Sequence, residues 1–165
     1  VCDKGEGFAV NVPVPESFND REMDYLREAV ILPLIEEFSP EVVIVQGGAD
    51  ALADDPLSRL GLSNNSLWRV LADVYRTSPK LLLLGGGGYN PWSVARCWAG
   101  FCAVLFRKEI PTVLPREAQQ LLRQISWRHS LSRNPPERWF TTLTDGPRWG
   151  DLRREVRSVA AAAMR

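Results

Sequence analysis

The sequence predicts an α/β fold built on a parallel sheet. Two short apolar runs, at residues 41–46 and 81–84, have the length and composition of strands that are buried on both faces. Between and after them lie segments whose apolar residues repeat at helical spacing. Because strands and helices alternate in the order β-α-β-α-β-α, we expect parallel strands joined by right-handed crossovers, with helices on either side of the sheet.

The first two predicted elements precede these runs. Residues 7–15 alternate apolar side chains with small or polar ones, as a half-buried strand does, and two prolines confine the end of that strand to an edge or a loop. Residues 17–40 predict a helix that Asn19 or Asp20 caps, with acidic residues in its first turn. Pro33 falls inside the helical pattern, so we expect a kink or a break there.

The remaining elements of this α/β pattern follow closely along the chain. The sequence predicts, in order, the strand at 41–46, a loop at 52–64, a helix at 66–79 and the strand at 81–84. Asn90 then caps a further helix, which has Pro91 at its first position and runs to about residue 105.

The chain changes character at about residue 108. From there it is rich in Pro, Arg and Trp, and residues 121–165 contain nine Arg and four acidic residues. We expect residues 153–165 to form a short helix, and residues 133–150 to be irregular but anchored by their tryptophans. The predicted organisation is an α/β domain at residues 1–107 and a C-terminal extension at residues 108–165 that packs on the same domain.

Composition narrows the possible functions. The 20 Lys and Arg residues balance the 20 Asp and Glu residues, which disfavours nucleic acid or a membrane surface as the main partner. No apolar run approaches the roughly 18 residues of a membrane-spanning helix. Cys2, Cys97 and Cys102 make neither a disulfide framework nor a Cys-x-x-Cys motif, which favours reduced thiols in a cytoplasmic protein. The single histidine, His129, is expected to be a surface or packing residue.

The first buried strand ends in a way that suggests chemistry. In "VIVQGGADALADDP" two glycines end the strand and Asp50 follows them. Ligands of open parallel sheets bind beyond the carboxyl ends of the strands, so Asp50 is a candidate metal ligand or general base. The alternative is that Asp50 caps the next turn or fixes the loop through hydrogen bonds to the backbone. For Asp54 and Asp55 we expect a solvated turn.

The second strand ends on four glycines, in "KLLLLGGGGYNPWSVARCW", and Tyr89 follows them. The run completes neither the P-loop pattern nor Gly-x-Gly-x-x-Gly, which disfavours a nucleotide site. A strand-to-helix turn accounts for one or two glycines, whereas four in a row indicate a surface that something approaches closely. The Tyr89 phenol is a suitable donor to a developing oxyanion, and we expect Asp50 and Tyr89 to face one cleft.

These stretches resemble a known family. "AVNVPV", "VIVQGGADALADDP" and "LLLLGGGGYNPWSVARCW" are similar, in order and spacing, to the second half of the zinc-dependent histone deacetylases. The bacterial acetoin-utilization-type deacetylases are the most similar branch, and "NPPERWFTTL" in the tail also resembles them. The resemblance implies the C-terminal portion of a three-layer, arginase/deacetylase-like α/β fold with a central parallel sheet. It also implies hydrolysis of an acetyl amide by zinc-activated water.

The resemblance assigns a role to each matching residue. Asp50 matches the last of three zinc ligands, and Tyr89 matches the tyrosine that hydrogen-bonds the acetyl carbonyl and then the tetrahedral oxyanion. Gly87 and Gly88 match the glycines that flank the acetyl-binding end of the pocket. The implied substrate is an acetylated lysine or an acetylated small amine.

Other parts of the family pattern have no counterpart in these 165 residues. They are the paired histidines, the Asp-x-His zinc ligands, a potassium site and the aromatic tunnel walls, all of which we expect upstream of Val1. On this interpretation the chain is half of an active site, and alone it would neither bind zinc tightly nor deacetylate. The alternative is a non-catalytic truncated fragment that acts as a structural or interaction module. Asp55 and Arg96 match family residues for which we expect no catalytic role.

Overall fold

The sheet forms where the sequence predicts its two apolar runs. In the computed structural model, which describes residues 7–165, β1 (Val43–Gly47) and β2 (Leu81–Gly85) pair in parallel, with Gly47 opposite Gly85. The helix α3 (Asn64–Thr77) connects the two strands, and α4 (Pro91–Leu105) follows β2. Parallel pairing and alternation of strands with helices agree with the predicted α/β class.

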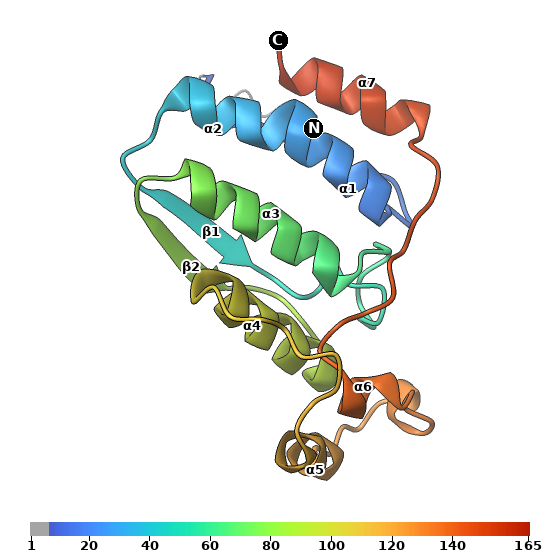
Figure 1. Cartoon of the computed structure of the whole chain (residues 1–165). Helices are drawn as coiled ribbons and strands as arrows, with labels where there is room; N and C mark the ends of the chain where they lie inside the picture. Colours follow the sequence, from blue (N-terminus) through green and yellow to red (C-terminus); the bar gives the residue numbers. More distant parts are fainter. Residues whose placement is uncertain (1–6) are drawn as a thin grey trace.

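The predicted first helix is present and its cap is Asn19. It consists of α1 (Asp20–Leu26), a π-helical segment η2 (Arg27–Ile31) and α2 (Leu32–Phe38), which form one continuous rod (Figure 1). Glu22 completes the capping box with Asn19. The expected kink or break at Pro33 takes another form. The helix does not break at the proline, but the α-helical pattern is interrupted just before it by η2, where the Leu32 N–H donates to the Arg27 carbonyl.

The predicted strand at residues 7–15 is also wrong. This segment is irregular and mostly exposed, and in the part of the chain that the structure describes β1 and β2 pair only with each other. A strand forms only where a neighbouring strand accepts its hydrogen bonds, and the alternating pattern does not supply that neighbour. Val12 and Val14 instead pack against the apolar cluster beneath α1.

The two faces of the sheet differ. The inward side chains of both strands pack against α3 and α4, in a cluster that contains Val45, Leu81, Leu83, Trp68, Leu71 and Phe101. On the opposite face Ile44, Leu82 and Leu84 are 62%, 49% and 44% exposed. Among residues 7–165, therefore, the prediction of a sheet covered on both faces is wrong. An exposed apolar face of this kind is typical of a surface that packs on another part of a protein.

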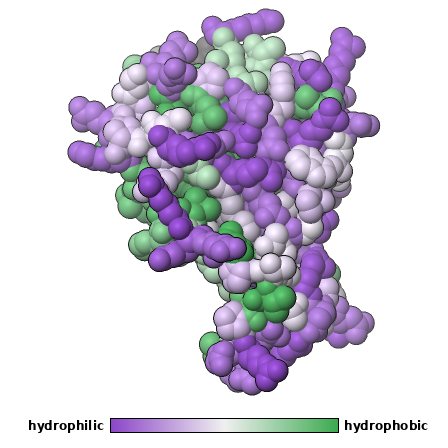
Figure 2. Space-filling view, viewed as in Figure 1, coloured by the Kyte–Doolittle hydropathy of each residue, from purple (hydrophilic) through white to green (hydrophobic). Residues whose placement is uncertain are grey.

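The tail contains α5 (Arg116–Gln124), a 3₁₀ turn η3 (Ser130–Ser132), α6 (Arg138–Thr141) and α7 (Arg154–Ala163). The helix predicted at the C-terminus is confirmed as α7, whereas α5 was not predicted. Figure 1 shows the tail running from α6 up to α7, which lies beside the rod of α1 and α2. Figure 2 shows a narrow end formed by the region of α5 and α6, and a face covered largely by polar residues.

Buried polar contacts fasten this tail to the rest of the molecule. The Asp20 carboxylate accepts the Arg148 backbone N–H at 2.8 Å, and the Glu22 carboxylate accepts the Arg153 Nε–H at 2.7 Å. Val156 and Ala160 of α7 are buried against the first helix.

The division of the chain into residues 1–107 and residues 108–165 stays a prediction. Cys2 lies outside the described residues. None of the helices in residues 7–165 is long and apolar enough to cross a membrane.

Candidate functional site

The loops that follow β1 and β2 lie against each other. The Ala49 N–H donates to the Gly87 carbonyl at 2.7 Å, which joins the two backbones two residues beyond the ends of the strands. At Gly86 an ideal Cβ would lie 2.7 Å from the Gly48 Cα, so only a glycine permits this approach. The parallel register brings the two ends to one edge of the sheet, as the sequence predicts.

The Asp50 carboxylate is held between two glycines. An ideal Cβ at Gly87 would lie 2.6 Å from the Asp50 Cγ, and one at Gly48 would lie 2.6 Å from Oδ1. The residue is half-buried, and no donor within residues 7–165 hydrogen-bonds its carboxylate. The alternative of a capping or loop-fixing role has no hydrogen bond to support it in this part of the chain. As far as residues 7–165 are concerned, the carboxylate oxygens are available to a ligand.

The four glycines at the end of β2 also permit close contacts within the chain. Gly88 has φ of +146°, where a larger residue is strained, and a Cβ there would lie 2.7 Å from Val94 Cγ2. Together with the close approaches at Gly86 and Gly87, this accounts for three of the four glycines. A Cβ at Gly85 would meet nothing within 4 Å. That Gly87 and Gly88 flank an acetyl group stays a prediction.

Tyr89 is fixed at its backbone and open at its ring. Its N–H donates to the Asp55 Oδ2 at 2.7 Å, while the side chain is 50% exposed. The next residue, Asn90, caps α4 as predicted and donates through Nδ2 to the Asp54 carbonyl at 3.0 Å. The loop after β1 therefore binds both Tyr89 and Asn90, the N-cap residue of α4.

The prediction that Asp54 and Asp55 form a solvated turn is wrong. Asp55 is buried and, besides the Tyr89 N–H, accepts the backbone N–H groups of Leu57 at 2.9 Å and Ser58 at 3.2 Å. The Asp54 carboxylate accepts hydrogen bonds from side chains of the tail, including the Trp139 Nε1–H at 2.8 Å. The dipeptide itself gave no signal of this, because the partners lie 34 and 85 residues away in sequence.

Two other expectations from the sequence are confirmed. Arg96 is structural: it is 1% exposed and donates to the Thr142 carbonyl at 2.6 Å and the Asp145 carboxylate at 2.7 Å. His129 is an exposed packing residue whose ring stacks on Trp127, with centroids 4.5 Å apart. Beside Arg96, burial raises the pKa of the Cys97 thiol to about 12, the Asp145 charge adds to this, and the Arg96 charge opposes it.

The donor set for a metal is incomplete in this part of the chain. Among residues 7–165 no three His, Cys, Asp or Glu side chains are grouped closely enough to hold a metal ion. A catalytic zinc takes three protein ligands and an open position. The Asp50 carboxylate has the chemistry and the freedom for one of these places. The other protein ligands of a zinc at this position would have to come from outside the described residues.

Comparison with known sequences supports the resemblance. The model of the histone deacetylase domain family matches residues 1–105. The putative histone deacetylase 2 of Caenorhabditis elegans is 41% identical over 103 residues, which are 60% of this chain and 20% of that protein. Human histone deacetylase 1 is 35% identical over 112 residues, 68% of this chain and 23% of that protein. The chain thus spans about a fifth to a quarter of these two relatives.

Comparison with solved structures extends the likeness to the tail. A crystal structure of an HDAC homologue from Aquifex aeolicus has 33% sequence identity and a TM-score of 0.87, over 97% of this chain and 43% of that chain. A structure of an HDAC homologue complexed with SAHA matches over the same shares with a TM-score of 0.86. Coverage of 97% includes most of the residues beyond 105. These matches confirm the expected arginase/deacetylase-like α/β fold, and the chain belongs to the histone deacetylase domain family.

Proposed function

We propose that this chain is the C-terminal half of a zinc-dependent deacetylase domain and that it supplies one metal ligand and the oxyanion donor of the site. The observation that carries the proposal is the Asp50 carboxylate. It accepts no hydrogen bond from residues 7–165 and lies against Gly87, two residues before Tyr89. A carboxylate kept free in this position has the chemistry of a metal ligand.

Each residue of the two loops has a separate task in this proposal. Asp50 would be one of the zinc ligands, and a bound zinc would polarise the acetyl carbonyl and lower the pKa of a zinc-bound water to about 7. The Tyr89 phenol donates a hydrogen bond to the carbonyl oxygen and stabilises the negative charge that develops on that oxygen. Gly87 and Gly88 leave room for the acetyl group, and Asp55 fixes the backbone from which the phenol extends.

The rest of the site comes, in this proposal, from sequence outside the chain. That part supplies the remaining zinc ligands, the histidine pair and a potassium site, and it covers the exposed face formed by Ile44, Leu82 and Leu84. The substrate is an acetylated lysine or an acetylated small amine. We further assign the protein to the acetoin-utilization-type branch and to the cytoplasm, without nucleic acid or a membrane as a direct partner.

The test uses the complete deacetylase domain that contains this chain. Tyr89→Phe is expected to lower kcat by about 10²–10³-fold and to leave the zinc content unchanged, because it removes only the donor to the oxyanion. Asp50→Asn is expected to lower the zinc content itself. Tyr75→Phe, near the C-terminal end of α3, is the matched control. A rate within about twofold of the parent in Tyr89→Phe would refute the oxyanion role.

The exposed sheet face favours a second candidate, a non-catalytic module that packs on another protein. The intact mass of the protein purified from its source, measured under denaturing conditions, separates the two candidates. A mass near 18.5 kDa, without bound zinc or turnover, supports the module. A mass about twice that, with zinc, supports the deacetylase.

A further inference from the structure

We propose that the Asp54 carboxylate couples the C-terminal tail to the loops that carry Asp50 and Tyr89, so that the tail is a positioning element of the site. The inference rests on the proposed function for its consequence in catalysis, but the coupling itself is a property of this chain. It concerns residues 138–148, which lie beyond the 105 residues that the family model matches.

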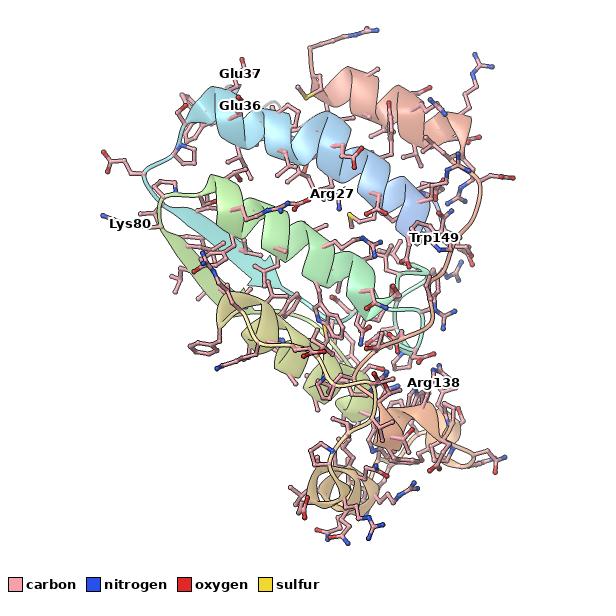
Figure 3. All side chains as sticks on the ribbon, in the orientation of Figure 1. Arg27, Glu36, Glu37, Lys80, Arg138 and Trp149 are labelled. Carbon is pink, nitrogen blue, oxygen red and sulfur yellow. The ribbon has the colours of Figure 1, made fainter. Side chains whose placement is uncertain are left out.

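The first step is the set of donors around Asp54. Its Oδ2 accepts the Trp139 Nε1–H at 2.8 Å and a guanidinium N–H of Arg138, and its Oδ1 lies 3.5 Å from the Arg148 guanidinium. The Asp54 side chain is 15% exposed, whereas the two arginines are 37% and 40% exposed. All three donors belong to the tail, and Figure 3 shows Arg138 at α6, of which it is the first residue.

The second step leads from Asp54 to Tyr89. The Asp54 carbonyl accepts the Asn90 Nδ2–H at 3.0 Å, and the neighbouring Asp55 accepts the Tyr89 N–H at 2.7 Å. The Asp54 side chain therefore binds the tail, while the Asp54 carbonyl binds the N-cap residue of α4 and the Asp55 side chain binds Tyr89. Asp50 lies in the same loop, four residues before Asp54, so a shift of this loop moves both candidate site residues.

The third step is the rigidity of the tail at this point. The Trp139 ring stacks on Trp92 of α4, with centroids 5.3 Å apart and planes 22° from parallel. Phe140 packs edge-on against the Trp92 ring, and Trp92, Trp139 and Phe140 are all buried. The contacts thus close a circuit from Asn90 along α4 to Trp92, across to Trp139, and back through Asp54. A packed circuit of this kind limits the movement of the loop far more than a surface ion pair does.

Two substitutions separate this coupling from general stability. Trp139→Phe removes the N–H that binds Asp54 and keeps an aromatic ring in the cluster. Trp127→Phe is the matched control, because Trp127 packs on Trp92 in the same cluster and does not contact Asp54. Asp54→Ala removes the carboxylate, and Asp54→Asn keeps an oxygen that accepts the Trp139 Nε1–H. We expect Asp54→Asn to lie between the parent and Asp54→Ala.

The primary measurement is amide hydrogen exchange in the intact protein that contains these 165 residues. We expect Trp139→Phe and Asp54→Ala to exchange the Tyr89 amide and the amides of residues 49–58 at least about fivefold faster, while the amides of α7 exchange at the parental rate. Trp127→Phe is expected to match the parent in these loops. An unchanged Tyr89 amide, or equally faster exchange throughout the chain, would overturn the inference.

A second measurement tests whether the coupling affects the catalytic rate. In the complete deacetylase domain we expect Trp139→Phe to lower kcat by about tenfold while KM and zinc content stay near the parental values, and Trp127→Phe to leave kcat near that of the parent. Equal kcat in both variants would overturn the positioning role. If the parent domain shows no deacetylation and the exchange result still holds, the proposed function fails and the coupling stands.

Discussion

The backbone N–H of Tyr89 donates to the Asp55 carboxylate at 2.7 Å, so the loop after β1 holds the residue that follows β2. The same carboxylate accepts two N–H groups of its own loop, from Leu57 and Ser58. These three N–H donors stabilise the buried Asp55 carboxylate, which pairs with no cation among residues 7–165. The loops after β1 and β2 are therefore joined by hydrogen bonds, and a substitution in either loop should change the position of the other.

Gly87 is the first place to test this unit, because a side chain there meets the Asp50 carboxylate. Gly87→Ala places a Cβ 2.6 Å from the Asp50 Cγ and must displace that group. In the complete domain we expect the zinc affinity, measured by competition with a chelator, to fall about tenfold or more. Gly85→Ala is the matched control, since its Cβ meets nothing within 4 Å. Equal affinities in the two variants would show that Asp50 does not hold the metal.

The sequence predicts the elements around the site well because their signals are local. Asn90 and Pro91 show the start of α4 by capping chemistry alone, and the apolar runs that end in glycines show β1 and β2. The position of Asp50 and Tyr89 at one edge of the sheet then follows from parallel pairing. The chemical roles of those two residues come from the family resemblance and stay predictions.

What the sequence could not show depends on partners that are distant along the chain. Nothing within a few residues of Asp54 and Asp55 indicates that Trp139 and Tyr89 hydrogen-bond them. Residues 7–15 have the alternation of a strand, but alternation does not state whether a neighbouring strand exists. Ile44 is β-branched and apolar like a core residue, yet its exposure depends on what covers the sheet, which the run itself does not encode.

Arg96 should be essential for the stability of the chain. Its guanidinium and the Asp145 carboxylate are 1% and 8% exposed, and Arg96→Leu leaves that carboxylate buried without its counter-charge. We expect chemical denaturation to give an unfolding free energy lower by about 3–5 kcal/mol. Arg76→Gln breaks a surface pair with Asp73 and is the control, with an expected loss below about 0.5 kcal/mol. Similar losses in both variants would contradict the structural role of Arg96.

Glu22 should make stability depend on pH. Burial raises its pKa, but hydrogen bonds from Arg153 and Asn19 outweigh this and hold the pKa below the usual value of a glutamate, about 4.3. The unfolded chain therefore binds more protons in this range, so stability present above about pH 4.3 is lost as the pH falls through the pKa of the folded state. We expect Glu22→Gln to flatten this part of the curve of unfolding free energy against pH.

The reference for that curve is Glu117→Gln, which also removes one negative charge but lies on α5, away from Arg153. Both variants are unfolded by denaturant at a series of pH values between about 3 and 7. Superimposable curves for the two variants would mean that the Arg153 contact with Glu22 does not persist in solution.

The two described cysteines should differ in reactivity, and the difference reports on the packing beside Arg96. Burial raises the pKa of Cys97 to about 12, and Cys102 is exposed. With this pKa, on the order of 10⁻⁴ of Cys97 is thiolate at about pH 8. We expect iodoacetamide to modify Cys102 in the native chain and to modify Cys97 only after denaturation, as measured by mass spectrometry of the peptides.

Arg96→Leu extends this experiment, because Cys97 can react only when the cluster that buries it, which includes Trp68 and Leu71 of α3, opens. The variant removes the guanidinium that binds both Thr142 and Asp145 of the tail, so Cys97 should be modified faster while Cys102 keeps its rate. Modification of Cys97 at the rate of Cys102 in the parent chain would show that the cluster of α4 with α3 does not form in solution. Unchanged protection of Cys97 in the variant would show that the apolar cluster around Cys97 holds without the ion pair of Arg96 and Asp145.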